Sequence, residues 1–390
     1  MLAGVVRTVV LAIIGTGTTA GTPPPPVLTA TDFSRGAFAA PAFLTNGLLG
    51  LRPGPVPLLA GPFAGAPPPL TFDPTVSAVV AGFMYRDVSL NEVVAPAPYP
   101  FATAVLVDGR DVLRAPDARA VPLSQAFDMG TGELYTRFEI TSRGVTVALN
   151  ATMFVSRSMP TLAAMRVTAA ITSQGRRGNL TLAPALSLHF AAARAIDCST
   201  NATDAGAGLE NCSVPAVTYN DTIPGPSMPG WAAWVWDKNA HRLGAVTNLG
   251  SKVGLAAVPN MTRTGEGSVI YECLVSVVPS AVSGGADPVH SAYTHVERAM
   301  YLGGYNLYSN PTPGQAPPPG GFGALQRKDR AAWATLWEAR PLVSGPDVAA
   351  IAADQRMIDG AFFYMHSHAH PSNTMGVADY GLSCDGRMCE

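Results

Sequence analysis

Apolar and polar residues alternate along most of the chain between about residues 40 and 280, and this pattern constrains the fold more than any other feature. In 145–155 the odd-numbered positions are apolar, so in an extended chain Thr146, Asn150 and Thr152 lie on the other face. Short polar turns at 128–133 and 236–241 join such runs as hairpins. We therefore predict a mainly β fold of large antiparallel sheets packed as a sandwich, with one sheet face in water.

After Pro279 the spacing of apolar residues becomes helical in three successive segments. Asp287 is placed to cap the first, the second is expected from about 325 to 338, and the third starts at the capping box 344–347 and ends before Pro371. The sequence thus predicts a β module followed by a helical one. The three apolar stripes are Val289, Ala292, Tyr293, Val296, Ala299 and Met300; Ala332, Trp333, Leu336 and Trp337; and Val348, Ile351, Ala352, Ile358, Phe362 and Met365.

The overall composition fits a folded protein with no polyanionic partner. The chain has 390 residues, 47% of them hydrophobic, and a formal net charge of -2. We predict no nucleic-acid partner, because Lys and Arg are few and scattered. Residues 1–20 contain Arg7, a short apolar run and then small residues, which predicts a signal peptide; an N-terminal core strand is the alternative. No stretch is long and apolar enough to predict a membrane span.

The glycosylation acceptors support passage through the secretory pathway. Six asparagines stand in Asn-x-Ser/Thr context, and all of them lie between residues 150 and 262. We therefore predict a secreted protein, or one that resides in the lumen of the secretory pathway, with glycans on these side chains. The six acceptors are Asn150, Asn179, Asn201, Asn211, Asn220 and Asn260.

An oxidising compartment would permit disulfide bonds between some of the five cysteines. Cys198 and Cys212 flank a polar loop that a disulfide would close, and Cys384 and Cys389 could close the last loop in the same way. Cys273 lies in an apolar strand pattern and is expected to be a buried free thiol. No Cys or Cys/His spacing is typical of zinc, and we predict neither a metal nor a cofactor.

Three groups of residues are chemically able to act, but each has a structural alternative. The histidines come where the third helix should end, and only the outer two share a helix face, so a helix C-terminus is favoured over a metal site. The carboxylates lie at a turn and along a strand, where pairing or capping is favoured over catalysis. The tryptophans could stack on sugars or fill the core. These residues are His366, His368 and His370; Asp128, Glu133 and Glu139; and Trp231, Trp234 and Trp236.

Six short segments, in order, resemble glycoside hydrolase family 65. An Asn-Gly turn is followed by an Ala-Gly-x-x-Tyr strand, a hairpin with Asp-x-x-Thr-Gly before Thr-Arg-Phe, a Ser-Arg strand, a Trp-x-x-Leu-Trp helix and a Gly-Leu-Ser loop. Together they extend over most of the chain. They occupy residues 41–50, 81–85, 123–138, 154–166, 333–337 and 381–383.

The resemblance implies a galactose mutarotase-like super-β-sandwich followed by an (α/α)6 barrel. Members hydrolyse or phosphorolyse α-glucosides with inversion, and the catalytic groups come from the barrel, beyond Glu390. We therefore expect a signal peptide at 1–20, a sandwich at 21–284, a helical linker at 285–343 and the start of a truncated barrel at 344–390. The barrel would be the missing packing partner, so 344–390 should be loosely held.

The function predicted is that of the N-terminal part of a secreted inverting α-glucosidase acting on trehalose or glucosyl-galactosyl-hydroxylysine, without catalytic residues of its own. Its ligand would be an α-glucoside or glycan. A noncatalytic carbohydrate-binding or cell-surface glycoprotein and a disaccharide phosphorylase fragment are the alternatives. Tyr380, Asp385 and Arg387 in the terminal loop are candidate substrate contacts, because loop-borne polar residues can reach a ligand.

Overall fold

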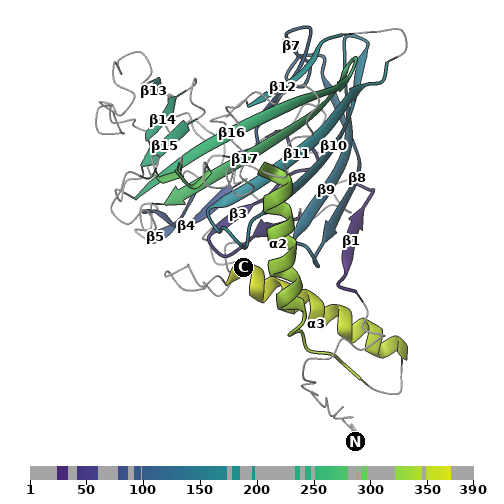
Figure 1. Ribbon diagram of the computed structural model, residues 1–390, viewed down its shortest axis with the longest axis vertical. Helices are drawn as coiled ribbons and strands as arrows, with labels where there is room; N and C mark the ends of the chain where they lie inside the picture. The colour runs from purple at the N-terminus through teal and green to yellow at the C-terminus, as the bar shows by residue number, and fades with distance from the viewer. Residues whose placement is uncertain are drawn as a thin grey trace, which may run out of the picture.

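The computed structural model describes residues 24–33, 42–59, 78–86, 92–97, 99–173, 178–184, 196–197, 233–237, 242–246, 251–279, 288, 291–292, 294–296, 321–344 and 348–369. Most of these residues lie in strands of three sheets, and two long helices follow the last strand (Figure 1). The mainly β, antiparallel fold predicted from the alternation is confirmed.

The largest sheet has ten strands, and all neighbouring pairs are antiparallel except β13 and β14. Two-residue turns set the register of two of its hairpins. Its strands, from edge to edge, are β1 (Val27–Ala30), β8 (Arg119–Asp128), β9 (Glu133–Ser142), β10 (Val145–Val155), β11 (Leu162–Ile171), β17 (Ser268–Pro279), β16 (Lys252–Gly265), β15 (Arg242–Val246), β14 (Ala233–Asp237) and β13 (Ile196–Asp197).

Two smaller sheets share one hydrophobic core with the large sheet. Leu49 and Phe83 of the four-stranded sheet, and Val105 of the three-stranded sheet, belong to the same buried cluster as Phe138 and Leu149 of the large sheet. This shared core makes the β region a sandwich. The small sheets comprise β2 (Leu44–Thr45), β3 (Leu49–Leu51), β4 (Ala78–Arg86) and β5 (Glu92–Pro96), and β12 (Leu180–Pro184), β6 (Thr103–Val107) and β7 (Arg110–Asp111).

Strand β10 follows the predicted alternation, but the prediction of one wet sheet face is only partly correct. Val147, Leu149 and Met153 are buried while Asn150 is exposed. Phe154, on the other face, is also buried, because a second apolar cluster lies there. That cluster combines strand residues with Ala292 and Val296 of the first helical segment and with Phe322 and Leu325 of the next helix. Helices therefore cover part of the face that was expected to be in water.

Helix α2 (Gly321–Trp337) lies across the large sheet (Figure 1). It begins four residues before the predicted start at 325, because Phe322 extends the buried face by one turn and packs edge-on against Phe154. Trp333 and Trp337 are buried as predicted. The helix also buries Asp329, which an apolar stripe does not anticipate.

Helix α3 (Val348–His368) buries a different face from the predicted stripe. Phe362 is buried, but Met365 is 65% exposed and Ile351 and Ile358 are only partly covered. The buried positions instead include polar side chains, of which Gln355 and Asp359 pair with residues before the helix. They are Gln355, Asp359, Phe362, Phe363 and Ser367.

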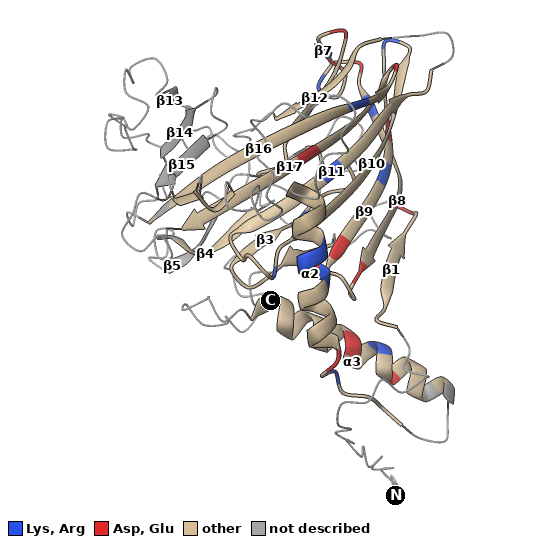
Figure 2. Ribbon diagram, in the orientation of Figure 1, with Lys and Arg blue, Asp and Glu red and all other residues tan. Residues whose placement is uncertain are grey.

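Charged side chains are sparse along the central strands and more frequent at α2, α3 and the hairpin ends (Figure 2). A basic part of α2 lies beside an acidic part of β9 in the same view. Among the described residues no helix combines the length and the apolar character that crossing a bilayer requires.

Candidate functional site

Four of the segments that resemble family 65 meet where the helices dock on the sandwich. We call this region the junction and define it by Asn46, the turn 128–133, the loop 156–160, α2 and α3. The Asn46 side chain donates to the Ser156 and Pro160 carbonyls at 2.6 and 2.8 Å. Its Oδ1 accepts from the Leu48 and Leu49 amides, both at 3.0 Å. One buried amide thus joins the first small sheet to the loop after β10.

The β8–β9 turn packs against the two tryptophans of α2. Gly132 has a φ of 67°, and a Cβ built on it would lie 2.7 Å from the Trp333 Nε1 atom. The Trp337 indole donates to the Met129 carbonyl at 3.0 Å. Glycine is therefore required at 132 twice over, for its left-handed backbone and for the close approach of the indole ring.

Asp329 holds the loop after β10 from the buried side of α2. Its Oδ1 accepts hydrogen bonds from the Arg157 and Ser158 amides and from the Ser156 hydroxyl. Its Oδ2 is buried and has no partner among the described residues. Burial raises the pKa of Asp329 to about 7, although the three hydrogen bonds oppose the shift.

Glu133 makes a second polar clamp between the turn and α2. It is only 1% exposed, and Arg330 binds both of its carboxylate oxygens, Nε to Oε1 at 2.5 Å and Nη2 to Oε2 at 2.8 Å. Gln326 and the Tyr135 hydroxyl also donate to Oε2. A bidentate pair with two further donors satisfies this carboxylate fully.

Arg157 connects the sandwich to the C-terminal end of α3. Its guanidinium donates to the His366 carbonyl and, at 3.4 Å, to the Ala369 carbonyl, and it lies 5.3 Å from the Trp333 ring centre. A cation is favourable at this end of a helix because the last carbonyls lack partners within the helix. Burial lowers the pKa of His366, and the nearby Arg157 charge lowers it further.

The two helices are held to each other by stacked rings and by a buried ion pair. Phe363 stacks on Trp333 with ring centres 4.9 Å apart, and Phe362 packs on Trp337 at 5.1 Å. Arg340 pairs with Asp359 at 3.2 Å, and Gln355 donates to Asp359 at 2.7 Å. These side chains explain why α3 buries its polar positions.

The carboxylates considered as acids or bases have structural partners. Asp128 caps its turn by accepting from the Gly130 amide at 2.8 Å, and Glu133 is paired with Arg330. Glu139 lies half-buried within β9. Sequence reasoning missed Asp329 and Arg330; the available signal was an aspartate one helical turn from both Leu325 and Trp333 on the apolar side of α2.

Only part of the predicted set of modified and ligand-binding residues lies within the described structure. Asn150, Asn179 and Asn260 are exposed. Cys273 is buried, and no disulfide is formed by it. The remaining acceptors Asn201, Asn211 and Asn220, the paired cysteines Cys198, Cys212, Cys384 and Cys389, and the loop residues Tyr380, Asp385 and Arg387 lie outside the described residues.

Of the predicted histidines and tryptophans, some lie within the described structure and others lie outside it. His366 and His368 lie in the last turn of α3, where the His368 ring stacks on Phe43, whereas His370 lies outside the described residues. No three potential ligand side chains are grouped as a metal site in the described part of the chain. Trp234 and Trp236 are in β14, and Trp231 lies outside the described residues.

A large antiparallel sandwich with helices fixed to one side is the class of protein that this geometry defines. Within that class, residues 43–204 match the family model of the glycosyl hydrolase family 65 N-terminal domain. The resemblance inferred from the sequence segments is thereby confirmed.

A solved structure from the human microbiome, whose assignment as a kojibiose phosphorylase is provisional, matches with a TM-score of 0.55 at 11% identity. The match covers 88% of this chain and 41% of the other, so this chain spans less than half of that protein's length. The likeness shows the fold. No curated protein matches the sequence.

Proposed function

We propose that this chain is the platform of an inverting α-glucoside-processing enzyme, most closely a hydrolase, and that it fixes a helical catalytic module on the sandwich. The observation that carries the proposal is the convergence of four family-like segments at the junction. Side chains from these segments contact α2 and α3 directly: Phe43 stacks on His368, Glu133 pairs with Arg330, and Arg157 donates to the His366 carbonyl. The buried carboxylates of the described residues, Glu133, Asp329 and Asp359, are all engaged in holding the helices.

The chemical reason for such a platform lies in the geometry of inversion. An inverting glycosidase needs two carboxyl-type groups about 6.5 to 9.5 Å apart around the sugar. An error of about 1 Å in their placement can lower the rate roughly a hundredfold. Rigid docking of the helices supplies the required accuracy. In the proposal the two catalytic groups belong to a part of the enzyme outside this chain, which itself does not turn over substrate.

The proposal also includes the secretory compartment. Three of the six acceptor asparagines, Asn150, Asn179 and Asn260, are exposed, which is what a glycan requires. Protein secreted from a eukaryotic host should lose apparent mass when it is treated with an endoglycosidase. An unchanged mass would contradict both glycosylation and the proposed compartment.

The deciding experiment is a turnover assay of the 390-residue chain on trehalose, kojibiose and glucosyl-galactosyl-hydroxylysine, with and without phosphate. We expect no turnover from this chain alone. Where the reading frame continues beyond Glu390, the longer product should release glucose without phosphate. Phosphate-dependent turnover by the longer product would instead support the phosphorylase alternative.

Two outcomes would contradict the proposed platform function. Turnover by the 390-residue chain that is lost in Glu133→Gln would place the active site in the sandwich. Tight binding of a glycan by a chain whose reading frame ends at Glu390 would favour the carbohydrate-binding glycoprotein. Calorimetry with the same three sugars measures that binding directly.

A further inference from the structure

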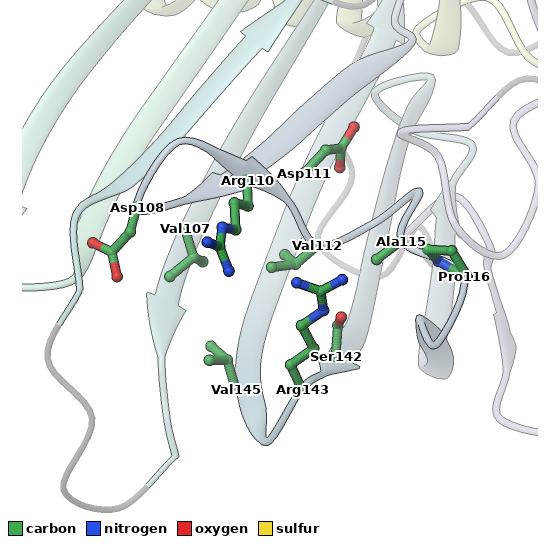
Figure 3. Close-up of a pocket in the computed structure, with 10 residues that line it drawn as sticks. All are labelled: Val107, Asp108, Arg110, Asp111, Val112, Ala115, Pro116, Ser142, Arg143 and Val145. Carbon is green, nitrogen blue, oxygen red and sulfur yellow. The ribbon is translucent and has the colours of Figure 1, made fainter.

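A hollow of about 530 Å³ lies at the end of the sandwich that carries β7, away from α3 (Figures 1 and 3). Three buried valines, from the end of β6, the residue after β7 and the start of β10, form its apolar wall, and two exposed arginines lie at its mouth. A volume of this size suits a small molecule. The lining residues are Val107, Asp108, Arg110, Asp111, Val112, Ala115, Pro116, Ser142, Arg143 and Val145.

The two arginines come from hairpins that are distant in sequence. Arg110 follows the two-residue turn 108–109 between β6 and β7, and Arg143 is the first residue of the turn 143–144 between β9 and β10. In Figure 3 the Arg110 side chain extends toward Val107 and the Arg143 side chain extends toward Val112, from opposite sides of the hollow. The sandwich thus brings two cationic groups together over an apolar surface.

The neighbouring carboxylates are already engaged. Asp108 accepts from the Asn179 amide at 2.8 Å, and Asp111 pairs with Arg114 at 2.9 Å. Asp117 accepts from the Arg143 amide at 2.7 Å, whereas its contact with the Arg143 guanidinium is 3.8 Å long. No described side chain hydrogen-bonds the Arg110 guanidinium. Guanidinium donors in this hollow are therefore available to a ligand.

Arg143 occupies a backbone position that does not favour arginine. Its φ is 50°, and Gly144 follows with a φ of 73°, which is the geometry of a type I′ turn. Asn, Asp and Gly are preferred there, and other residues lose about 1 kcal/mol in the left-handed region. Asp108, in the matching turn, is one of the preferred types. The sequence therefore places a guanidinium at the hollow in spite of its backbone cost.

We infer that this hollow binds a small organic anion, whose carboxylate or phosphate lies between Arg110 and Arg143 while its carbon body contacts Val107, Val112 and Val145. A planar guanidinium offers paired donors that match either oxyanion. The apolar wall should add affinity for a ligand that carries carbon next to its anionic group. This site is independent of the platform proposed above.

Ligand-observed NMR titrations of the full chain at constant ionic strength test the inference. The probes are acetate and benzoate for the carboxylate, and inorganic phosphate and phenyl phosphate for the phosphate. We expect saturable binding, with the aromatic member of each pair at least threefold tighter. Whichever pair of probes binds more tightly, the carboxylates or the phosphates, identifies the anionic group that the hollow prefers.

The informative variant is Arg143→Asn, which removes the guanidinium but suits the turn better. It should raise the midpoint of thermal unfolding and weaken binding at least tenfold, and Arg110→Gln should weaken binding to a similar extent. Arg137→Gln is the control, because Arg137 is exposed in the middle of β9 and changes the net charge equally. The inference is wrong if the probes bind the Arg110→Gln, Arg143→Asn double variant as they bind the native chain, or if the control loses as much affinity.

Discussion

At the scale of single residues, the junction depends on close contacts between buried atoms. A side chain at position 132 would meet the Trp333 ring, and Asp329 is 1% exposed with three donors reaching its Oδ1. Cys273 shows a similar confinement: burial raises the pKa of its thiol to about 12. For such positions the direction in which a substitution or a change of pH alters stability can be predicted.

Gly132→Ala should destabilise the protein by about 2 kcal/mol or more, because it combines left-handed strain with a clash. The Cβ would lie 2.7 Å from the indole nitrogen. Gly54→Ala is the matched control, since nothing lies within 4 Å of its added Cβ. Urea unfolding of the two variants and the native chain measures the difference. Equal destabilisation by both changes would contradict the proposed contact.

Asp329→Asn should remove a pH dependence of stability. The pKa of Asp329 is raised in the folded state to about 7 from an ordinary value of 3.8, so the folded protein binds the extra proton between these values. The stabilisation by this group is complete below about pH 4 and is lost as the pH rises to about 7, at roughly 1.4 kcal/mol per pH unit.

Asparagine keeps an oxygen that can accept from the three donors. Like the protonated acid, it carries no charge. The midpoint of urea unfolding, measured from pH 4 to pH 8, should therefore decline less steeply for the variant than for the native chain. Parallel profiles would show that Asp329 does not titrate in this range.

At the scale of elements, what the sequence predicted depends on the range of the interactions involved. The strands and hairpins were predictable because alternation and turn chemistry are local: Asp128 does pair with Glu133 across its turn. The buried face of α3 was not predictable, because contacts with Arg340 and with the Trp333 and Trp337 rings of α2 determine which side chains of α3 are covered. The same holds for the Glu133 clamp, whose partner Arg330 is 197 residues away, and for the hollow, which two separate hairpins form.

Arg157→Met should loosen the end of α3 while leaving the sandwich intact. Methionine retains much of the apolar contact with Trp333 but cannot donate to the His366 and Ala369 carbonyls. Hydrogen exchange should become faster in 362–369 and stay unchanged in β10. Arg356→Met, at an exposed position of α3, is the control and should alter neither segment. Unchanged exchange in 362–369 would contradict the role assigned to Arg157.

At the scale of the whole molecule, the sandwich and the helices form one packed body. Trp333, Trp337, Phe362 and Phe363 belong to the same buried cluster as the strands of both sides of the sandwich. For α3, which ends at His368, this packing predicts a firmly held segment, in contrast to the expectation from the sequence that 344–390 is loosely held. Elements that share a core tend to open together.

Limited proteolysis under native conditions should consequently spare 351–369 as long as it spares the central strands. Met357 and Met365 are 73% and 65% exposed, but their helical backbone has to open before a protease can bind it. Trp333→Ala should make this segment the first to be cut, because it removes the ring on which Phe363 stacks. Rapid cleavage in 351–369 of the native chain would restore the earlier expectation.

The contacts of the loop 156–158 also set an order of events during protein synthesis. Ser156 hydrogen-bonds a residue 173 positions later, and Arg157 one 209 positions later. At about 5 to 20 residues per second, the loop and the apolar surface beneath α2 wait roughly 10 to 40 s on the ribosome for their partners. Nascent chains arrested before α2 emerges should therefore bind chaperones that recognise apolar surface, and should release them once both helices have been made.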